Sequence, residues 1–341
     1  MKVLQVMAGA EFGGAEEFFT RLVIALHKTD LEQSVFIREN PARAERLIQN
    51  GVRPTQLKFG GRFDFKTPWI LKRNIKSFKP DIVFSWMNRA TSMCPPKGAF
   101  IQVGRLGGYY NLKYYRDCDY LVANTEDIVT YVVNNGWSKD KVFYLPNFVS
   151  EKRFKPIDRQ DFATPSKAPL ILAMGRLHKN KAFDVLLEAV SRVPNVYLWL
   201  AGDGPLREVL ETQAEKLGIK SRIRFLGWRN DPEKLYAAAD MFVCPSRHEP
   251  LGNVIIESWA QRIPVIAADS LGPKDLICHG ENGLLFSIDD VMSLVQGIKH
   301  LIEDNALREK LVFRANQDFA ETYTESIVVA KYRKFFEKVS Q

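Results

Sequence analysis

Cysteine is scarce in this chain of 341 residues, and long apolar runs are absent. The four cysteines, Cys94, Cys118, Cys244 and Cys278, form no C-x-x-C pair, which predicts neither a zinc site nor a disulfide framework and favours a reducing cytoplasm. No apolar run reaches the roughly 18 residues that a membrane-spanning helix needs. The first residues, MKVLQVMAGAEFGGAEE, predict a short strand and a Gly-Gly turn rather than a signal peptide.

Acidic residues are scarce in one region of the first half. Between residues 38 and 79 the chain has eleven basic residues against three acidic ones. Lys72, Lys76 and Lys79 are spaced to share one face of a helix, with Arg73 beside them. This pattern suits an anionic membrane surface, and a solvated helix face is the plainer interpretation. No RNA- or DNA-binding motif accompanies the cations, so no nucleic-acid partner is expected.

Short apolar segments that suit strands alternate with amphipathic segments that suit helices, and the pattern occurs twice. The expected strands are 2–7, 34–37, 82–86, 99–103, 120–123 and 142–145 in the first half, and 170–175, 196–201, 223–226, 241–244 and 265–267 in the second. Expected helices include 15–27, 66–78, 125–134 and 325–339. The sequence therefore predicts an α/β protein with domains at 1–164 and 165–320 and a separate terminal helix at 321–341.

Two glutamates, Glu249 and Glu257, stand eight positions apart around the start of an expected helix. Pro250 disfavours helical backbone at Glu249, so this carboxylate is expected in the loop after the strand 241–244 and Glu257 inside the following helix. Both can then face the crevice at the carboxyl end of a parallel sheet, where open α/β folds bind ligands. Carboxylates placed there suit the hydroxyl groups of a sugar or a ribose.

This Glu-x7-Glu element, followed by a Pro-Val-Ile strand and HGENGLLF, resembles the retaining glycosyltransferases of family 4, which have the GT-B fold. Three other stretches agree with the family in order and spacing: AGAEFGGAEEF at 8–18, MGRLHKNKAFDVLLEA at 174–189 and LAGDGPLREVLE at 200–211. The resemblance implies two doubly wound, Rossmann-like domains that face a central cleft. It also implies acceptor binding by the first domain, nucleotide-sugar binding by the second, and a terminal helix that crosses back to the first domain.

Glycosyl transfer from a nucleotide sugar leaves a diphosphate, and its growing negative charge needs a metal ion or fixed cations and backbone amides. The chain offers the second set. Gly13 and Gly14 precede an expected helix, whose N-terminal N–H groups can approach an anion, although a plain tight turn has the same sequence. Arg176 and Lys181 follow an expected strand and add positive charge. In the resembled family the matching residues hold the diphosphate.

The resemblance assigns further roles. Glu257 is expected to bind the nucleotide ribose, and Glu249 to orient the transferred sugar and stabilise positive charge at its anomeric carbon. Other residues are expected to lie near the donor or to contact it through backbone groups, with Arg229 in the region that reads the base: Gly202, Gly204, Arg229, Gly252 and Asn253. For Gly202 and Gly204, simple helix initiation before a proline is an equal alternative.

Two positions depart from the family pattern. Many relatives have a histidine of the first domain near the transferred sugar, but the only histidine before residue 178 is His27, on the first expected helix. Arg105, in the expected loop 103–109, is the candidate replacement, and it would donate hydrogen bonds because it stays charged. The family's Lys-Gly is Lys181-Ala182 here, a change from which no consequence is expected.

Asp117 and Asp119 form an Asp-x-Asp pair, which metal-dependent glycosyltransferases of another fold use to hold a divalent ion. Here the pair precedes an expected strand of the first domain, and cations are already available for the diphosphate. We expect the pair to be structural, and we expect no metal or other cofactor.

These observations predict a metal-independent retaining glycosyltransferase, cytoplasmic or peripheral on the inner membrane face. It would move a hexose from a nucleotide diphosphate sugar to a hydroxyl of a cell-surface glycan or glycolipid precursor, such as the lipopolysaccharide core. The alternatives are a nucleotide-sugar epimerase or a phosphorylase on the same architecture, and a non-catalytic module that binds anionic lipid or polymer. The sequence identifies neither the sugar nor the base.

Overall fold

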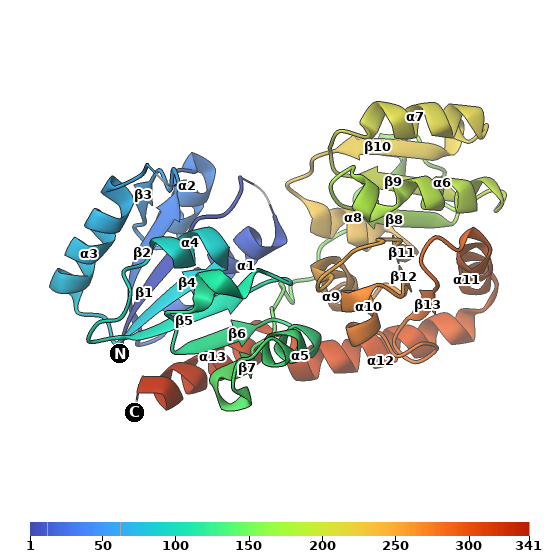
Figure 1. The fold of residues 1–341 in the computed structure, drawn as a ribbon. Helices are drawn as coiled ribbons and strands as arrows, with labels where there is room; N and C mark the ends of the chain where they lie inside the picture. Colours follow the sequence, from blue (N-terminus) through green and yellow to red (C-terminus); the bar gives the residue numbers. More distant parts are fainter. Residues whose placement is uncertain (12, 62, 341) are drawn as a thin grey trace. The chain divides into compact units, whose positions relative to one another are not determined.

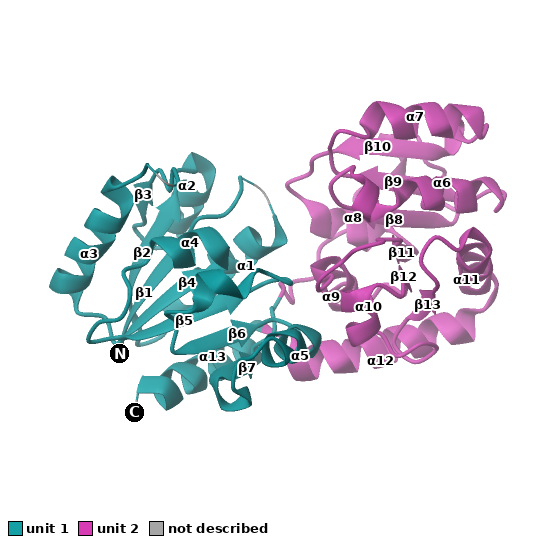
Figure 2. Cartoon of the chain, in the orientation of Figure 1, with its two compact units in different colours: residues 1–148, 325–341 teal, residues 149–324 magenta. Residues whose placement is uncertain are grey.

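The computed structural model describes residues 1–11, 13–61 and 63–340, and the chain forms two compact units. Unit 1 comprises Met1–Phe148 and Glu325–Gln341, and unit 2 comprises Val149–Thr324 (Figure 2). The segment 149–164, which the sequence placed in the first domain, therefore groups with unit 2. Phe12, within the stretch 8–18, and Gln341, at the end of the expected terminal helix, lie outside the described residues, as does Arg62.

Unit 1 contains a seven-stranded parallel sheet in the order β3-β2-β1-β4-β5-β6-β7 (Figure 1). Its strands are β1 (Lys2–Met7), β2 (Glu32–Arg38), β3 (Thr55–Leu57), β4 (Ile82–Trp86), β5 (Ile101–Leu106), β6 (Tyr120–Ala123) and β7 (Val142–Tyr144). Its helices are α1 (Gly14–His27), α2 (Pro41–Gln49), α3 (Lys66–Phe78), α4 (Met87–Met93), α5 (Glu126–Asn134) and α13 (Glu325–Ser340). One face of the sheet packs on α1, α2 and α13, and the other on α3 and α4.

Unit 2 contains a six-stranded parallel sheet in the order β10-β9-β8-β11-β12-β13. Its strands are β8 (Leu170–Met174), β9 (Tyr197–Ala201), β10 (Ile223–Gly227), β11 (Met241–Cys244), β12 (Val265–Ala268) and β13 (Leu284–Phe286). Its helices are α6 (Phe183–Ser191), α7 (Arg207–Lys216), α8 (Pro232–Ala238), α9 (Asn253–Ala260), α10 (Leu271–Leu276), α11 (Val291–Glu303) and α12 (Asn305–Thr322). Helices α6, α7 and α11 cover one face of the sheet, and α8 and α9 cover the other.

Both units are doubly wound, as predicted, and each has a point where the strand order reverses. In unit 1 this point lies between β1 and β4, and in unit 2 between β8 and β11. Open α/β sheets bind ligands at the carboxyl ends of the strands beside this point. The loops after β1, β8 and β11 are therefore the places to look for a site.

The last helix, α13, is part of the core of unit 1. Val328, Tyr332, Phe335 and Phe336 of this helix are buried, and the Tyr332 ring centre lies 6.1 Å from that of Phe84 on β4. Within the described part of the chain, no helix is both long and apolar enough to span a bilayer.

The expected strand 99–103 is displaced in the structure. β5 runs from Ile101 to Leu106, so Arg105 lies within a strand rather than in a loop. Parallel pairing continues to the end of this strand, where Arg105 stands opposite Trp86 of β4. A Cβ atom at Gly104 would lie 2.5 Å from the Tyr115 ring, so this glycine allows close packing beneath the ring and does not mark a turn.

Candidate active site

The loops that follow β8 and β9 in unit 2 are interlocked. Gly202 and Gly204 have φ angles of 135° and 159°. A Cβ atom on Gly202 would lie 2.0 Å from the carbonyl oxygen of Gly175, and one on Gly204 would lie 2.6 Å from that of Leu177. Glycine is therefore required at both positions by backbone packing. Their contact with a nucleotide donor stays a prediction.

Lys181 and Glu249 approach one another from two loops and form an ion pair. Lys181 ends the short turn η4 (Lys179–Lys181) after β8, and Glu249 lies in the loop after β11. The two side chains are 23% and 13% exposed, and the Ser246 hydroxyl donates to Glu249 at 3.4 Å. Burial acts to lower the pKa of Lys181, but the Glu249 carboxylate outweighs it, and the net pKa is raised. Lys181 is therefore charged at neutral pH and already paired.

The residue that follows Lys181 has a left-handed backbone. Ala182 has φ 50° and ψ 36° at the start of α6, a conformation that raises the energy of an L-residue other than glycine by about 1–2 kcal/mol. The sequence predicted no consequence from alanine where the resembled family has glycine. The structure corrects this, because Ala182 is held in a conformation that glycine would adopt without strain.

The start of α9 lies beside Glu249. Gly252 caps this helix with a φ angle of 95°, a Cβ atom on it would lie 3.6 Å from Cγ of Glu249, and Asn253 is the first helical residue. Farther along α9, Glu257 accepts a hydrogen bond from the phenol of Tyr236 at 3.2 Å. Burial, reinforced by the Glu257 carboxylate, holds the pKa of Tyr236 well above its usual value, so the phenol remains a neutral donor that orients Glu257.

The two predicted donor-binding arginines have different surroundings. Arg176, in the loop after β8, is exposed and has no hydrogen bond or ion pair with any residue the structure describes. Arg229 is engaged: its Nε and Nη2 atoms donate to the Asp231 carboxylate at 2.9 and 2.8 Å, and its guanidinium lies 5.5 Å from the centre of the Phe162 ring. Arg176 can therefore bind a phosphate with its full set of donors, whereas the contact of the Arg229 backbone with the base stays a prediction.

In unit 1 the carboxylate of Glu16, in the first turn of α1, folds back onto the turn that precedes this helix. Glu16 is 7% exposed and accepts a hydrogen bond from the Ala10 N–H at 2.7 Å. A Cβ atom on Gly9 or Gly13 would lie 2.4 or 2.3 Å from its oxygens, so both glycines leave room for this side chain. The sequence predicted an anion site at Gly13 and Gly14, yet the structure places negative charge there. A phosphate could bind at this turn only after Glu16 moves.

Arg105 is fully buried in unit 1. Its Nε donates to the Tyr332 hydroxyl at 3.0 Å and its Nη2 to Oδ1 of Asn147 at 2.5 Å, while its guanidinium lies 4.9 and 4.4 Å from the ring centres of Phe18 and Trp86. Its Nη1 has no hydrogen-bond partner among the described residues. In this conformation Arg105 does not reach a ligand, so the geometry favours packing over the predicted donation to a sugar.

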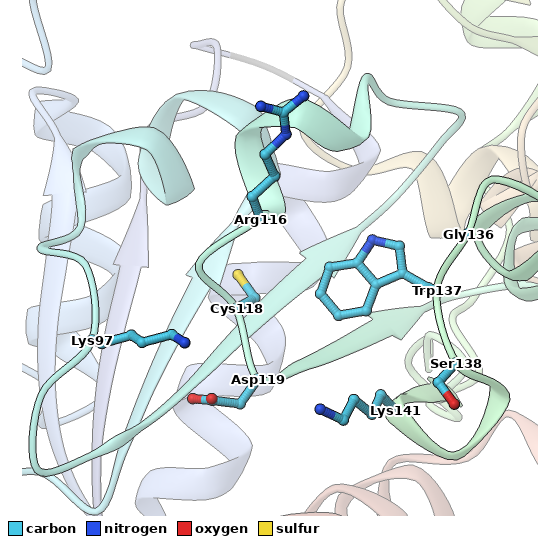
Figure 3. A pocket seen from close by; sticks show the side chains of 8 residues that line it. All are labelled: Lys97, Arg116, Cys118, Asp119, Gly136, Trp137, Ser138 and Lys141. Atoms are coloured by element: carbon cyan, nitrogen blue, oxygen red, sulfur yellow. The ribbon is translucent and has the colours of Figure 1, made fainter.

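The Asp-x-Asp pair lies at the other end of the unit 1 sheet. Asp119 lines a pocket of about 370 Å³ at the amino ends of β5, β6 and β7, and Lys97, Arg116 and Lys141 line the same pocket (Figure 3). The Gln102 N–H donates to Asp119 at 2.9 Å. A lining that contains three cationic side chains opposes a divalent cation. Across residues 1–11, 13–61 and 63–340, no group of three or more His, Cys, Asp or Glu side chains is arranged to hold a metal.

Sequence reasoning missed two residues of these loops. Glu16 closes the turn before α1, and Arg247 joins the loop after β11 to neighbouring segments. Glu16 stands two positions after Gly14, and Arg247 stands two positions before Glu249. That proximity was the available signal, but it does not reveal which groups the side chains contact.

Comparison with known proteins identifies relatives over the whole chain. The model of the family described as Glycosyltransferase Family 4 matches residues 12–153, and that described as Glycosyl transferases group 1 matches residues 154–318. The lipopolysaccharide core biosynthesis glycosyltransferases LpsE and LpsD of Rhizobium meliloti (strain 1021) are 38% and 36% identical to the chain. The matches cover 97% of this chain and 98% of LpsE, and 99% of this chain and 98% of LpsD.

A solved structure with the same fold is that of HepE from Anabaena, in complex with UDP and glucose. It superposes with a TM-score of 0.86 at 21% identity, and the match covers 99% of this chain and 100% of HepE. At this level of identity the likeness establishes the two-domain GT-B fold that the sequence predicted.

Proposed function

The chain belongs to the family 4 glycosyltransferases, and from this premise we propose that it is a metal-independent retaining enzyme of lipopolysaccharide core biosynthesis. It would transfer a hexose from a nucleotide diphosphate sugar to a hydroxyl group of a core precursor. Relatives named for lipopolysaccharide core biosynthesis and the complex of HepE with UDP and glucose support the acceptor and donor classes. The observation that carries the proposal is the Lys181–Glu249 pair at the strand-order reversal of unit 2.

The chemistry follows from where charge develops. The bond between the anomeric carbon and the diphosphate oxygen breaks, and its electron pair stays with the diphosphate. Lys181 and Arg176 would stabilise that growing negative charge, and the backbone N–H groups at the start of α9 would add to it. Glu249 would face the positive charge that develops on the sugar. The acceptor oxygen would bond to the anomeric carbon on the face that the diphosphate leaves, and its proton would pass to a diphosphate oxygen.

Donor incubations test this proposal and its alternatives. The protein is incubated in EDTA with UDP-, GDP- and ADP-hexoses, with and without a lipopolysaccharide core precursor. We expect one donor to give a glycosylated acceptor with the anomeric configuration of the donor. Conversion of the sugar without an acceptor would indicate an epimerase, and transfer that needs added Mg²⁺ would contradict metal independence. No calorimetric binding of either UDP or GDP would favour a non-catalytic module.

An anionic membrane surface is the second part of the proposal. Phe63, Phe65 and Trp69, at the start of α3, are 84%, 78% and 60% exposed. The Asp64 carboxylate accepts two backbone N–H groups at 2.8 and 3.0 Å and fixes the turn between the phenylalanines. Soluble surfaces rarely gather large aromatic side chains in this way, whereas the interface of a bilayer accommodates them.

Cations surround Trp69 on the exposed face of α3. The exposed cationic residues of this helix, spaced three or four positions from Trp69 or from one another, are Lys66, Lys72, Arg73 and Lys76. Lys79, which the sequence placed on the same face, ends the helix with a left-handed backbone. Exposed aromatic side chains surrounded by cations are typical of a surface that binds the headgroup region of an anionic bilayer. This interpretation explains the exposed aromatic residues, which a plain solvated helix face does not.

Vesicle co-sedimentation tests the membrane surface. We expect binding to vesicles that contain phosphatidylglycerol and little binding to pure phosphatidylcholine. Each cation near such a surface contributes about 1 kcal/mol, so Lys72→Glu with Lys76→Glu should weaken binding by about 30-fold or more. Lys299→Glu with Lys310→Glu, at exposed positions of unit 2, is the matched control. Equal binding of both double variants would contradict this surface.

A further inference from the structure

One guanidinium of unit 2 connects three segments of the chain. Arg247 donates through Nε to Asp289 at 2.6 Å, in the loop after β13. Its Nη1 and Nη2 atoms donate to the two carboxylate oxygens of Asp184, in the first turn of α6, at 3.0 and 2.7 Å. Nη1 also donates to the carbonyl oxygen of Lys179 at 2.8 Å. A guanidinium has five N–H donors, so these contacts leave little capacity for a ligand.

The loop after β11 makes a second contact with the turn that carries Lys181. The N–H of His248 donates to the carbonyl oxygen of Asn180 at 3.3 Å. Two consecutive residues of the loop after β11 thus hold two consecutive carbonyl groups of η4. The turn then ends at Ala182 in a left-handed conformation. Such a conformation persists in a residue other than glycine when the surroundings over-determine it.

We propose that Arg247 is a positioning residue: it clamps the strained turn 179–182 to the loop of Glu249 and so holds the Lys181 ammonium and the Glu249 carboxylate in register before substrate binds. The inference rests on the proposed function, in which these two groups contact the donor. It assigns Arg247 no contact with substrate. Arg176, which has no internal partner among the described residues, is the arginine available to a phosphate.

Hydrogen–deuterium exchange of the ligand-free protein tests the clamp without reference to activity. The N–H groups of Lys181 and Ala182 donate within the turn, at 2.8 and 3.3 Å. We expect Arg247→Ala to speed exchange in peptides that span residues 178–183. The control is Arg192→Ala, which removes an arginine paired with Glu188 along the surface of α6. Equal exchange in the two variants would overturn the clamp.

Steady-state kinetics tests the consequence for the reaction. A displacement of about 1 Å at a reacting group can lower the rate by about 100-fold, so Arg247→Ala should lower kcat/KM for the donor by about 10- to 100-fold. The acceptor KM should stay unchanged. Arg247→Lys keeps the positive charge but not the planar guanidinium with its several donors, so its kcat/KM for the donor should lie between those of wild type and Arg247→Ala. Faster exchange with unchanged donor kinetics would overturn the positioning role.

Ala182→Gly provides the rescue. Glycine adopts the left-handed conformation without strain, so the turn should then depend less on its clamp. We expect Arg247→Ala with Ala182→Gly to recover much of the lost protection and activity, and a double variant no better than Arg247→Ala would overturn the link to the Ala182 backbone. A wild-type protein that transfers no hexose refutes the proposed function, while the exchange experiment still decides whether the clamp exists.

Discussion

Replacing Glu249 by glutamine should destabilise unit 2 and change the titration of Lys181. Glutamine keeps the shape of the side chain and removes the negative charge that pairs with Lys181. In the native protein, burial acts to lower the pKa of Lys181 and the Glu249 carboxylate more than compensates. In Glu249→Gln the burial remains and the compensation is lost. We therefore expect the pKa of Lys181 to fall below its usual value of 10.5.

The size of the effect follows from the exposure of the pair. Removing one partner of a fully buried ion pair destabilises a protein by about 3–5 kcal/mol. Here 23% of the Lys181 side chain and 13% of the Glu249 side chain are exposed, so about 2–3 kcal/mol is expected for Glu249→Gln. For a unit of this size, that lowers Tm by roughly 4–12 °C. Lys181→Met with Glu249→Gln leaves no unpaired charge, and we expect a loss of about 1 kcal/mol or less.

Scanning calorimetry on the wild type, Glu249→Gln, Lys181→Met and the double variant measures the coupling free energy between Lys181 and Glu249. The raised pKa of Lys181 means that its contribution is fully present below pH 10.5 and is lost as the pH rises through the native-state value. The difference between wild type and Glu249→Gln should therefore be constant near neutral pH and begin to shrink below pH 10.5, as Lys181 of the variant, with its lowered pKa, loses its proton. Additive losses in the double variant would refute the reasoning.

Three further substitutions give distinct outcomes. Gly202→Ala would place a Cβ atom 2.0 Å from the carbonyl oxygen of Gly175, so we expect a loss of about 3 kcal/mol or more in urea unfolding; a loss below about 1 kcal/mol would contradict the interlocked loops. Arg105→Met should lower Tm and leave the Kd for UDP within about twofold, whereas a large drop in kcat at unchanged Tm would restore the predicted sugar contact. Asp64→Ala should weaken the start of α3 by about 0.5–1 kcal/mol. The pKa of Asp64 is lowered chiefly by its hydrogen bond with the Thr67 hydroxyl. The stability difference between wild type and Asp64→Ala, followed by circular dichroism, should therefore vanish as the pH falls through the pKa of Asp64 in the folded protein.

Much of the fold could be predicted because its central strands are covered on both faces. The expected strands 82–86, 120–123 and 241–244 coincide with β4, β6 and β11, since strands buried on both sides read as continuous apolar runs. The edge strands β3 and β13 have three residues each and were missed, whereas the equally short edge strand β7 was predicted because the apolar run continues to Leu145. A run that short carries no periodicity to distinguish it from a loop.

The boundary of β5 was wrong for a different reason. Gly104 and Arg105 interrupt the apolar pattern, and such residues usually mark a loop. Tertiary packing makes them compatible with a central strand here. The Tyr115 ring occupies the space beside Gly104, and the rings of Phe18 and Trp86 flank the Arg105 guanidinium. These rings come from elsewhere in the chain, so no local pattern reveals them.

The charge pairing in the site could not be predicted either, because its partners come from distant parts of the chain. Lys181 was predicted to act at the diphosphate and Glu249 at the sugar, because nothing in the sequence indicates that residues 68 positions apart are paired. In the ligand-free fold they neutralise one another, and Arg247 fixes the loops that carry them. A diphosphate that binds Lys181 must therefore compete with Glu249. In the proposed function, donor binding would be an exchange of partners in which Glu249 turns toward the sugar as Lys181 engages the phosphate, so a single contact would couple recognition of the two halves of the donor.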